Sequence, residues 1–224
     1  MNCDELLSIM KGRRSIRSFT SDPIPQEHVD RILEAGRWAP SSANSQPWDF
    51  ILVTDDVIRQ GIYDNVLKVI EKIKTLRDFP FLQSFRAEYV LQAPLNIVVC
   101  GDPRFTRVSI MDGVDSQIEE FVFWGSVSLA VQNMWLAAHC LGLGAALFTD
   151  IYPSAIGKLL RVPDPIKVIC ILVVGFPAET PEPRSRRAIN DFTHYNMYDP
   201  SKKRSDRFVE EARKDPSKLF LKKA

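Results

Sequence analysis

Residues 124–147, WGSVSLAVQNMWLAAHCLGLGAAL, belong to the most apolar long stretch of the chain. Apolar side chains on nearly every face predict a helix over Ile118–Leu141 that is buried on several sides. Gly142 and Gly144 are expected to end this helix, and the apolar run Ala145–Phe148 to form a strand. Three polar residues interrupt the stretch: Gln132, Asn133 and His139. A membrane span needs about 20 predominantly apolar residues with few such breaks, so the stretch predicts a core helix and no membrane span.

The segments around this helix mix both kinds of secondary structure. Apolar residues spaced three and four apart predict an amphipathic helix over Gln26–Gly36. Apolar runs predict further strands at Phe50–Val53, Asn96–Cys100 and Val168–Val174, and residues 56–92 are expected to be helical. Because helices and strands do not alternate strictly, the pattern favours an α+β fold over a doubly wound parallel sheet.

Length, charge and cysteine content narrow the class of protein. The chain has 224 residues, and 29 Lys+Arg against 28 Asp+Glu leave a formal net charge of +1. This length predicts one domain, here residues 1–197, followed by a polar extension over residues 198–224 with a short helix at Asp206–Lys214. Near-zero net charge argues against a nucleic-acid-binding protein. The four cysteines lack CxxC spacing and predict reduced, buried thiols; with no signal-peptide pattern, the chain is expected in the cytoplasm.

Two arginine clusters lie near opposite ends of the chain. A helix is predicted at Asp4–Lys11, with Asn2 as its cap and Glu5 three residues on. The first cluster follows that helix and consists of Arg13, Arg14, Ser15 and Arg17. The second lies in PEPRSRR, after the last predicted strand, and consists of Arg184, Arg186 and Arg187. Guanidinium groups bind phosphate oxygens in pairs, and a serine hydroxyl adds a neutral donor. The clusters would hold a terminal phosphate if they converge, and are solvated surface charges if they do not.

A turn-rich loop, APSSANSQP at residues 39–47, displays small polar groups. Serines, Asn44 and Gln46 lie between prolines near both ends, which favours a rigid loop. Amide side chains match the donors and acceptors along the edge of a heterocycle. A solvated turn is the alternative.

The sequence lacks motifs for several other chemistries. Gly142-x-Gly144 has Leu147 where a dinucleotide fingerprint needs its third glycine, and it follows a helix instead of a strand. There is no Walker loop and no GxSxG. With three histidines in the chain, a histidine-based metal site is not expected.

Four stretches, in this order, resemble the nitroreductase family of FMN-dependent oxidoreductases. They are RRSIRSF at residues 13–19, APSSANSQPWDF at 39–50, the apolar stretch at 124–147, and GFPAETPEPRSRR at 175–187. The resemblance covers roughly residues 5–195. It implies a central, mostly antiparallel sheet flanked by helices, in an intertwined homodimer that binds FMN.

The same resemblance implies a set of site residues. Carried over position by position, the cofactor-binding residues are Arg13, Arg14, Ser15, Arg17, Pro40, Ser41, Ser42, Asn44, Gln46, Leu147, Phe148, Thr149, Asp150, Arg184, Arg186 and Arg187. The loop residues from Pro40 to Asn44 would reach the FMN of the partner subunit. Backbone donors around Leu147–Asp150 would lie near N5 and O4 of the flavin, where several relatives have Glu-Gly in place of Thr149-Asp150. No catalytic side chain is implied, because the flavin carries the redox chemistry.

The implied activity is electron transfer from NADH or NADPH, through FMN, to a small electron-poor acceptor such as a nitroaromatic or a quinone. Donor and acceptor would use one flavin face in turn, in a ping-pong mechanism. Within enzymes, the alternative is a specialised relative: a reductive dehalogenase, an enoate or hydroxy-acid oxidoreductase, or a flavin-cleaving enzyme. Alternatives of other classes are a non-catalytic flavin-binding module and a phosphate-binding regulatory domain.

The apolar helix also predicts a homodimer. Phe121, Trp124, Val131 and Trp135 would leave a large exposed patch on a monomer, and soluble monomers rarely expose such patches. A two-fold partner would cover the patch with the same patch.

Overall fold

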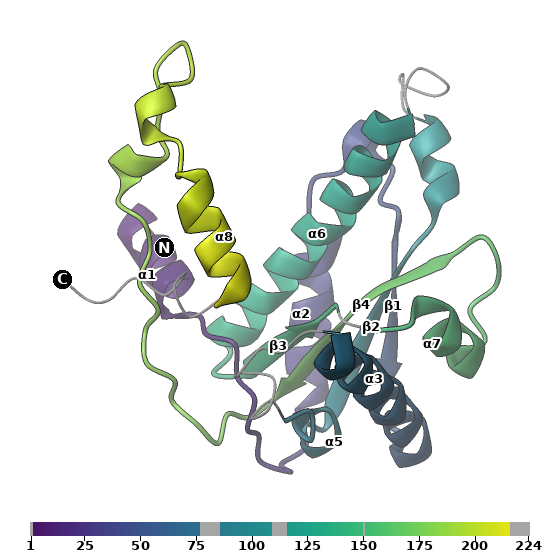
Figure 1. Ribbon diagram of the computed structural model, residues 1–224. Coiled ribbons are helices and arrows are strands. Elements are labelled where there is room, and N and C mark those ends of the chain that lie inside the picture. The colour runs from purple at the N-terminus through teal and green to yellow at the C-terminus, as the bar shows by residue number, and fades with distance from the viewer. Residues whose placement is uncertain (1, 77–85, 109–115, 150, 216–224) are drawn as a thin grey trace. The chain divides into compact units, whose positions relative to one another are not determined.

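The computed structural model describes residues 2–76, 86–108, 116–149 and 151–215. They belong to two units, each described by itself (Figure 1). The first unit consists of Met1–Lys72 and Arg86–Pro181, and the second of Ile73–Phe85 and Glu182–Ala224. The predicted division into a domain of residues 1–197 and an extension of residues 198–224 stays a prediction.

The first unit contains a four-stranded antiparallel sheet. Its strands are β1 (Trp48–Val53), β2 (Leu95–Gly101), β3 (Gly144–Phe148) and β4 (Lys167–Gly175). Their order across the sheet is β1-β2-β4-β3, so β2 and β4 lie in the middle. Every residue of β2 is buried, as expected for a strand rich in valine and isoleucine that is covered on both faces. The predicted α+β fold with an antiparallel sheet is confirmed.

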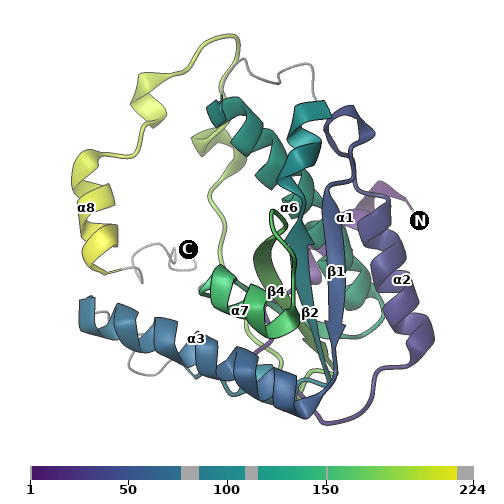
Figure 2. The same cartoon turned by 90° about the vertical axis from the view of Figure 1, so that its right-hand side faces the viewer.

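Helices cover both faces of this sheet (Figure 2). On one face, α2 (Gln26–Arg37) and α6 (Ser116–Cys140) form the main core with alternate side chains of β2, β3 and β4. On the other face lie α3 (Asp56–Leu76) and α7 (Pro153–Leu160), with α7 packed against β4.

The remaining helices test the local sequence signals. In α1 (Cys3–Gly12), the side chain of Asn2 accepts from the Glu5 N–H at 2.9 Å and the Glu5 carboxylate accepts from the Asn2 N–H at 2.8 Å, which confirms the predicted cap. α8 (Asp206–Lys214) has its predicted bounds. The sequence pattern does not predict α7, although a proline at its first residue is a start signal. The short elements are α5 (Tyr89–Gln92), η1 (Ser42–Asn44), η2 (Pro103–Val108), η3 (Ile189–Asp191) and η4 (Pro200–Lys202).

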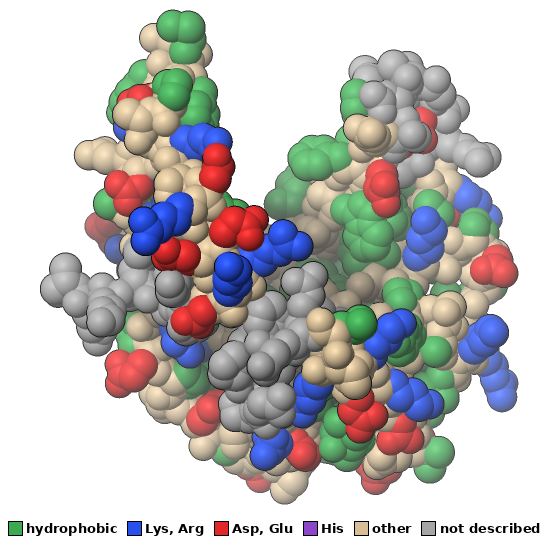
Figure 3. Space-filling view, viewed as in Figure 1, with side chains coloured by type: hydrophobic (Ala, Val, Ile, Leu, Met, Phe, Trp, Pro, Cys, Tyr) green, Lys and Arg blue, Asp and Glu red, His purple; other side chains and the backbone are tan. Residues whose placement is uncertain are grey.

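The long helix α6 is buried on one side only, so the prediction of burial on several sides is wrong for this chain. Val131 is 5% exposed and lies in the core, whereas Phe121 is 77% and Trp124 38% exposed. Hydrophobic side chains gather on the surface over this helix (Figure 3). By length and composition α6 could also cross a membrane, a weak test that the core helix of a soluble protein passes as well. The exposed apolar side of α6 is therefore the feature that needs a covering partner.

The cysteines divide into two kinds. Cys100 and Cys170 are buried in the sheet, as predicted, and burial raises the pKa of Cys170 to about 12 and that of Cys100 to about 11. Cys3 and Cys140 are exposed, which corrects the prediction of four buried thiols. All four are free thiols, and the described residues contain no group of side chains suited to a metal ion.

Candidate functional site

Residues Arg13–Phe19, here called the edge segment, run beside β3 and then beside the chain that follows β4. The Ile16 N–H donates to the Ala145 carbonyl at 3.0 Å, and Phe19 forms an antiparallel bridge with Pro177. Sheet hydrogen bonds therefore hold the first arginine cluster at the β3 edge of the sheet. They also bring RRSIRSF beside the start of GFPAETPEPRSRR.

Two glycines make this arrangement possible. Gly142 ends α6 with a φ of 75°, a conformation that glycine adopts without strain. Gly144 does not end the helix as predicted but begins β3. A Cβ atom at Gly144 would lie 2.7 Å from Cγ1 of Ile16, so any side chain there would push the edge segment away from the sheet.

Arg13 is stacked on an aromatic ring of α6. Its guanidinium carbon lies 4.3 Å from the centroid of the Trp135 ring, a cation–π geometry. The indole N–H of Trp135 is buried and donates no hydrogen bond among the described residues. A buried donor without an acceptor costs free energy unless a ligand or water satisfies it. Trp135 is therefore a candidate ligand contact.

The other residues of the first cluster have different surroundings. Arg14 Nη1 donates to the Arg13 carbonyl at 2.8 Å and to two further carbonyls at the end of α1, so it caps that helix. Arg17 is exposed, and its backbone N–H donates to the Glu179 carboxylate. Ser15 is half-buried. Arg17 and Ser15 are thus better placed than Arg14 to bind an added anion.

A cavity of about 510 Å³ lies between α6 and the β3–β4 side of the sheet. We call it the site cavity. It is lined by Trp124, Val127, Ser128, Val131, Gln132, Trp135, Leu147, Thr149, Pro153, Val168, Ile169 and Cys170. Among these described residues there is no Asp, Glu, His, Lys or Arg. Apolar walls with a few polar groups suit a flat molecule with polar edges.

The predicted residues at the end of β3 divide by strand alternation. Leu147 and Thr149 line the site cavity. The Phe148 side chain is buried on the opposite face, with its ring centroid 5.8 Å from that of Tyr89, because successive strand residues point to opposite faces. Only the backbone of Phe148 is available to a ligand in the cavity. Asp150 lies outside the described residues.

The sequence analysis did not single out the α6 residues that line the cavity as site residues. Ser128, Gln132 and Trp135 have i, i+4, i+7 spacing, which places them on one face of the helix. Polar or N–H-bearing side chains in one line of an otherwise apolar helix are the sequence signal that points to them.

The loop at residues 39–47 holds unusual backbone conformations. Ala43, Asn44 and Gln46 have φ values of 50°, 53° and 44°, which non-glycine residues rarely adopt and which often occur at functional sites. The Gln46 N–H donates to Ser41 Oγ at 2.9 Å, and Ser42 is tied by its N–H to Ser126 of α6 at 3.4 Å. The side chains of Asn44 and Gln46 are exposed and do not line the site cavity.

Asp102 joins the end of β2 to the base of this loop. Its carboxylate accepts from Arg104 Nε at 2.9 Å, and its N–H donates to the Pro47 carbonyl at 2.7 Å. The hydrogen bonds from Arg104 hold the pKa of Asp102 below its ordinary value.

His139 packs against the turn that carries Arg13. A Cβ atom at Gly12 would lie 2.8 Å from Nε2 of His139, so the imidazole occupies the space a side chain would need. Burial lowers the pKa of His139, and the charges of Arg13 and Arg14 lower it further. The imidazole is half-buried and its neutral form is favoured beside these arginines.

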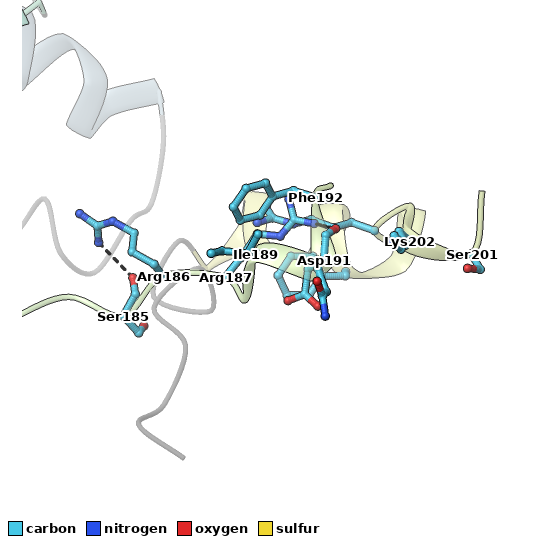
Figure 4. A pocket seen from close by; sticks show the side chains of 11 residues that line it. Ser185, Arg186, Arg187, Ile189, Asp191, Phe192, Ser201 and Lys202 are labelled. Atoms are coloured by element: carbon cyan, nitrogen blue, oxygen red, sulfur yellow. Dashed lines mark hydrogen bonds between the residues drawn. The ribbon is translucent and has the colours of Figure 1, made fainter. Parts of the chain in front are cut away.

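The second arginine cluster lies in the second unit and binds mainly to its own chain. Arg186 Nη1 donates to the carbonyls of Arg184 at 3.1 Å and Ser185 at 3.0 Å, and in Figure 4 its side chain points away from Phe192. Arg187 stacks over Phe192 at 5.5 Å. A cavity of about 1050 Å³ in this unit is lined by Ser185, Arg186, Arg187, Ile189, Asn190, Asp191, Phe192, Ser201, Lys202, Arg204 and Phe208. Convergence of the two arginine clusters stays a prediction.

Comparison with known proteins places this chain among its relatives. A family model described as the nitroreductase family matches residues 10–176. A protein of Methanothermobacter thermautotrophicus that carries the name NADH dehydrogenase/NAD(P)H nitroreductase is 32% identical over 80% of this chain and 81% of its own. A 5,6-dimethylbenzimidazole synthase of Rhodospirillum rubrum is 29% identical over 79% of this chain and 83% of its own.

A solved structure agrees with the sequence comparisons at the level of the fold. An iodotyrosine deiodinase bound to FMN and 3-iodo-L-tyrosine superposes with a TM-score of 0.73 at 23% identity, over 86% of this chain and all of that one, 100%. The fold and the basic sheet edge thus define a class of α+β proteins with an antiparallel sheet. Within that class, the chain belongs to the nitroreductase family.

Proposed function

We propose that the protein is an FMN-dependent oxidoreductase that passes electrons from NADH or NADPH to a small electron-poor acceptor, such as a nitroaromatic or a quinone. Family membership supports the FMN and the nicotinamide donor. The observation that carries the proposal is the junction of Arg13, Trp135 and the site cavity. One aromatic side chain both supports an arginine of the predicted phosphate cluster and lines the cavity.

The residues of the site cavity fit a bound flavin ring. Val127, Val131 and Leu147 supply apolar walls for a planar ring system. The indole N–H of Trp135 is a buried donor with no acceptor among the described residues, and the Gln132 amide can meet the polar edge of a heterocycle. Arg17 and Ser15 of the edge segment are the proposed phosphate contacts.

Bound FMN would supply the redox chemistry by accepting two electrons from the nicotinamide and giving them to the acceptor. The chain's own residues bind and orient the ring and keep water from it. The Cys170 thiol lines the cavity, but its raised pKa of about 12 keeps it protonated and unreactive. No acid, base or nucleophile is available from the described cavity wall, which agrees with a mechanism that needs none.

The proposed active unit is a homodimer. Phe121, Trp124 and Leu129 leave an apolar side of α6 exposed, and a second copy would cover it. Asn44 and Gln46 stand on a strained loop with their side chains exposed. In the proposed dimer, Pro40, Ser41, Ser42 and Asn44 reach the FMN of the partner subunit.

A simple experiment tests this function. The purified protein should be yellow, and heat should release FMN, identified by chromatography, at one per subunit. Anaerobic mixing with NADH or NADPH should bleach the flavin absorption, and a quinone or nitroaromatic should restore it. A colourless protein, or FAD in place of FMN, contradicts the cofactor assignment. A flavin that neither nicotinamide bleaches indicates a non-catalytic binding module.

A flavin-cleaving enzyme is the second candidate function. The chain is almost as similar to the 5,6-dimethylbenzimidazole synthase as to the nitroreductase relative. The two functions differ in the fate of FMN when the reduced protein meets oxygen. An oxidoreductase regains its full flavin absorption, whereas a flavin-cleaving enzyme loses it permanently.

A further inference from the structure

We infer that Asn65, on α3, is a positioning residue for the wall of the site cavity that Thr149 and Pro153 form. Asn65 does not line the cavity and acts through the chain between those two residues. The inference rests on the proposed function, because this wall is part of the proposed flavin site.

The Asn65 amide binds the backbone of a single residue, Tyr152. The Tyr152 N–H donates to Asn65 Oδ1 at 3.0 Å, and Asn65 Nδ2 is 3.5 Å from the Tyr152 carbonyl that it donates to. Asn65 is 6% exposed. A buried amide is costly unless both its donor and its acceptor are used, and here one carboxamide satisfies both groups of one peptide unit, as a neighbouring strand would.

Tyr152 is the point at which the cavity wall turns into a helix. Its carbonyl accepts from the N–H groups of Ala155 at 3.0 Å and Ile156 at 3.2 Å, and it is the N-cap of α7 without a side-chain cap. On the other side, the Ile151 N–H donates to the Thr149 carbonyl at 3.0 Å. Holding Tyr152 therefore holds the chain on both sides of it.

The same face of α3 contacts the other end of α7. A Cβ atom at Gly61, one turn before Asn65, would lie 2.9 Å from Cδ2 of Leu159. Residues four apart share a helix face, so Gly61 and Asn65 together fix the position of α7. α3 thus sets where Thr149 and Pro153 stand in the cavity.

This placement matters because a cofactor site tolerates little movement. Binding groups must be held to within about 0.5 Å of their productive positions by supporting contacts. Preorganised donors at the end of β3 would favour the reduced flavin, which carries more negative charge. Loss of the Asn65 clamp should therefore weaken FMN binding and also lower the midpoint potential, a change that reduced stability alone would not cause.

The test compares Asn65→Leu and Asn65→Asp with a control, Gln60→Leu, an exposed position of the same helix that bonds only to Asp64. The Leu variant loses both hydrogen bonds and should raise the FMN dissociation constant roughly ten-fold, the usual effect of an unsatisfied buried group. Its midpoint potential should become more negative, and hydrogen exchange at the Tyr152 amide should become faster. The Asp variant keeps an acceptor for Tyr152 and should show smaller changes of the same sign, which also serves if the Leu variant does not fold.

The possible results separate the two proposals. If the wild-type protein binds FMN and the Asn65 variants match Gln60→Leu in affinity and potential, the inference is wrong and the proposed function stands. If the wild-type protein binds no FMN, both are wrong.

Discussion

The two arginine clusters show how differently the same residue type can be held. In the edge segment, backbone hydrogen bonds to β3 fix the chain, and Arg13 stacks on Trp135 of the core helix. In the second unit, Arg186 bonds to the carbonyls of its own neighbours, and Arg187 stacks on the half-exposed Phe192. Tertiary structure positions the first cluster, whereas local geometry alone positions the second. The first is therefore the cluster whose removal should damage both the fold and the site.

The largest expected effect distinguishes the two aromatic supports. Trp135→Ala removes a half-buried ring that carries Arg13 and lines the site cavity, and should lower the free energy of unfolding by roughly 3 kcal/mol and abolish stable FMN binding. Phe192→Ala removes an exposed ring and should cost less than about 1 kcal/mol. Urea unfolding of both variants measures the difference. Equal losses would mean that both clusters are held in the same way.

The second prediction breaks the edge segment without touching an arginine. Gly144→Val places a side chain against Ile16 and should cost roughly 2 kcal/mol of stability, as other overpacked sites do, with weaker FMN binding. Gly157→Ala is the control, because a Cβ atom there meets its neighbours only at 3.8 Å or more, and Ala favours helices. A Gly144→Val protein as stable as the wild type would show that the edge segment does not need its close contact with β3.

The third prediction compares the clusters as phosphate contacts. Arg17→Ala and Arg186→Ala should each weaken FMN binding about ten- to hundred-fold, since a hydrogen bond to a charged group contributes about 1.5–3 kcal/mol. Arg31→Ala removes an exposed arginine of α2 that pairs with Glu27, and should leave FMN binding unchanged. Flavin fluorescence during dilution gives the three affinities. A loss with Arg17→Ala alone would leave the second cluster outside the phosphate site.

The smallest expected effect is a pH dependence at the base of the edge segment. The pKa of His139 is lowered in the folded protein, so the unfolded chain binds more protons as the pH falls below about 6.5. Stability should therefore decrease between pH 6.5 and pH 5, and His139→Gln should make this decrease shallower. Thermal unfolding across this pH range measures the slope. An unchanged slope in the variant would assign the acid sensitivity to other groups.

Strong local signals in the sequence predicted most of the fold. The Asn2 capping box, the period of α2 and the apolar runs of β2 and β4 each depend on neighbours along the chain. The same reasoning did not predict α7, which is short, and it placed Val131 on the wrong side of α6. A helix that is apolar all round carries no periodic signal to show which face packs on the sheet.

Site residues were predictable where a motif carries them and not where packing assembles them. The motifs point to Arg13, the loop at residues 39–47 and the end of β3. Gln132 and Trp135 became site residues only when α6 lay across β3, and Asn65 only when α3 met α7. The motifs also could not show that Arg14 caps α1 or that the Phe148 side chain faces away from the cavity.

By itself, the sequence determined the class of fold, the family and the stretches that carry its motifs, because these depend on composition, periodicity and residue order. A cytoplasmic location and the absence of a nucleic-acid partner stay predictions from composition. Only the tertiary structure decided which side of α6 is exposed, which β3 side chains enter the cavity and which polar groups hold its wall. The physical reason is that burial and hydrogen-bond partners come from residues far apart in the chain, and their pairing exists only once the sheet and helices have packed.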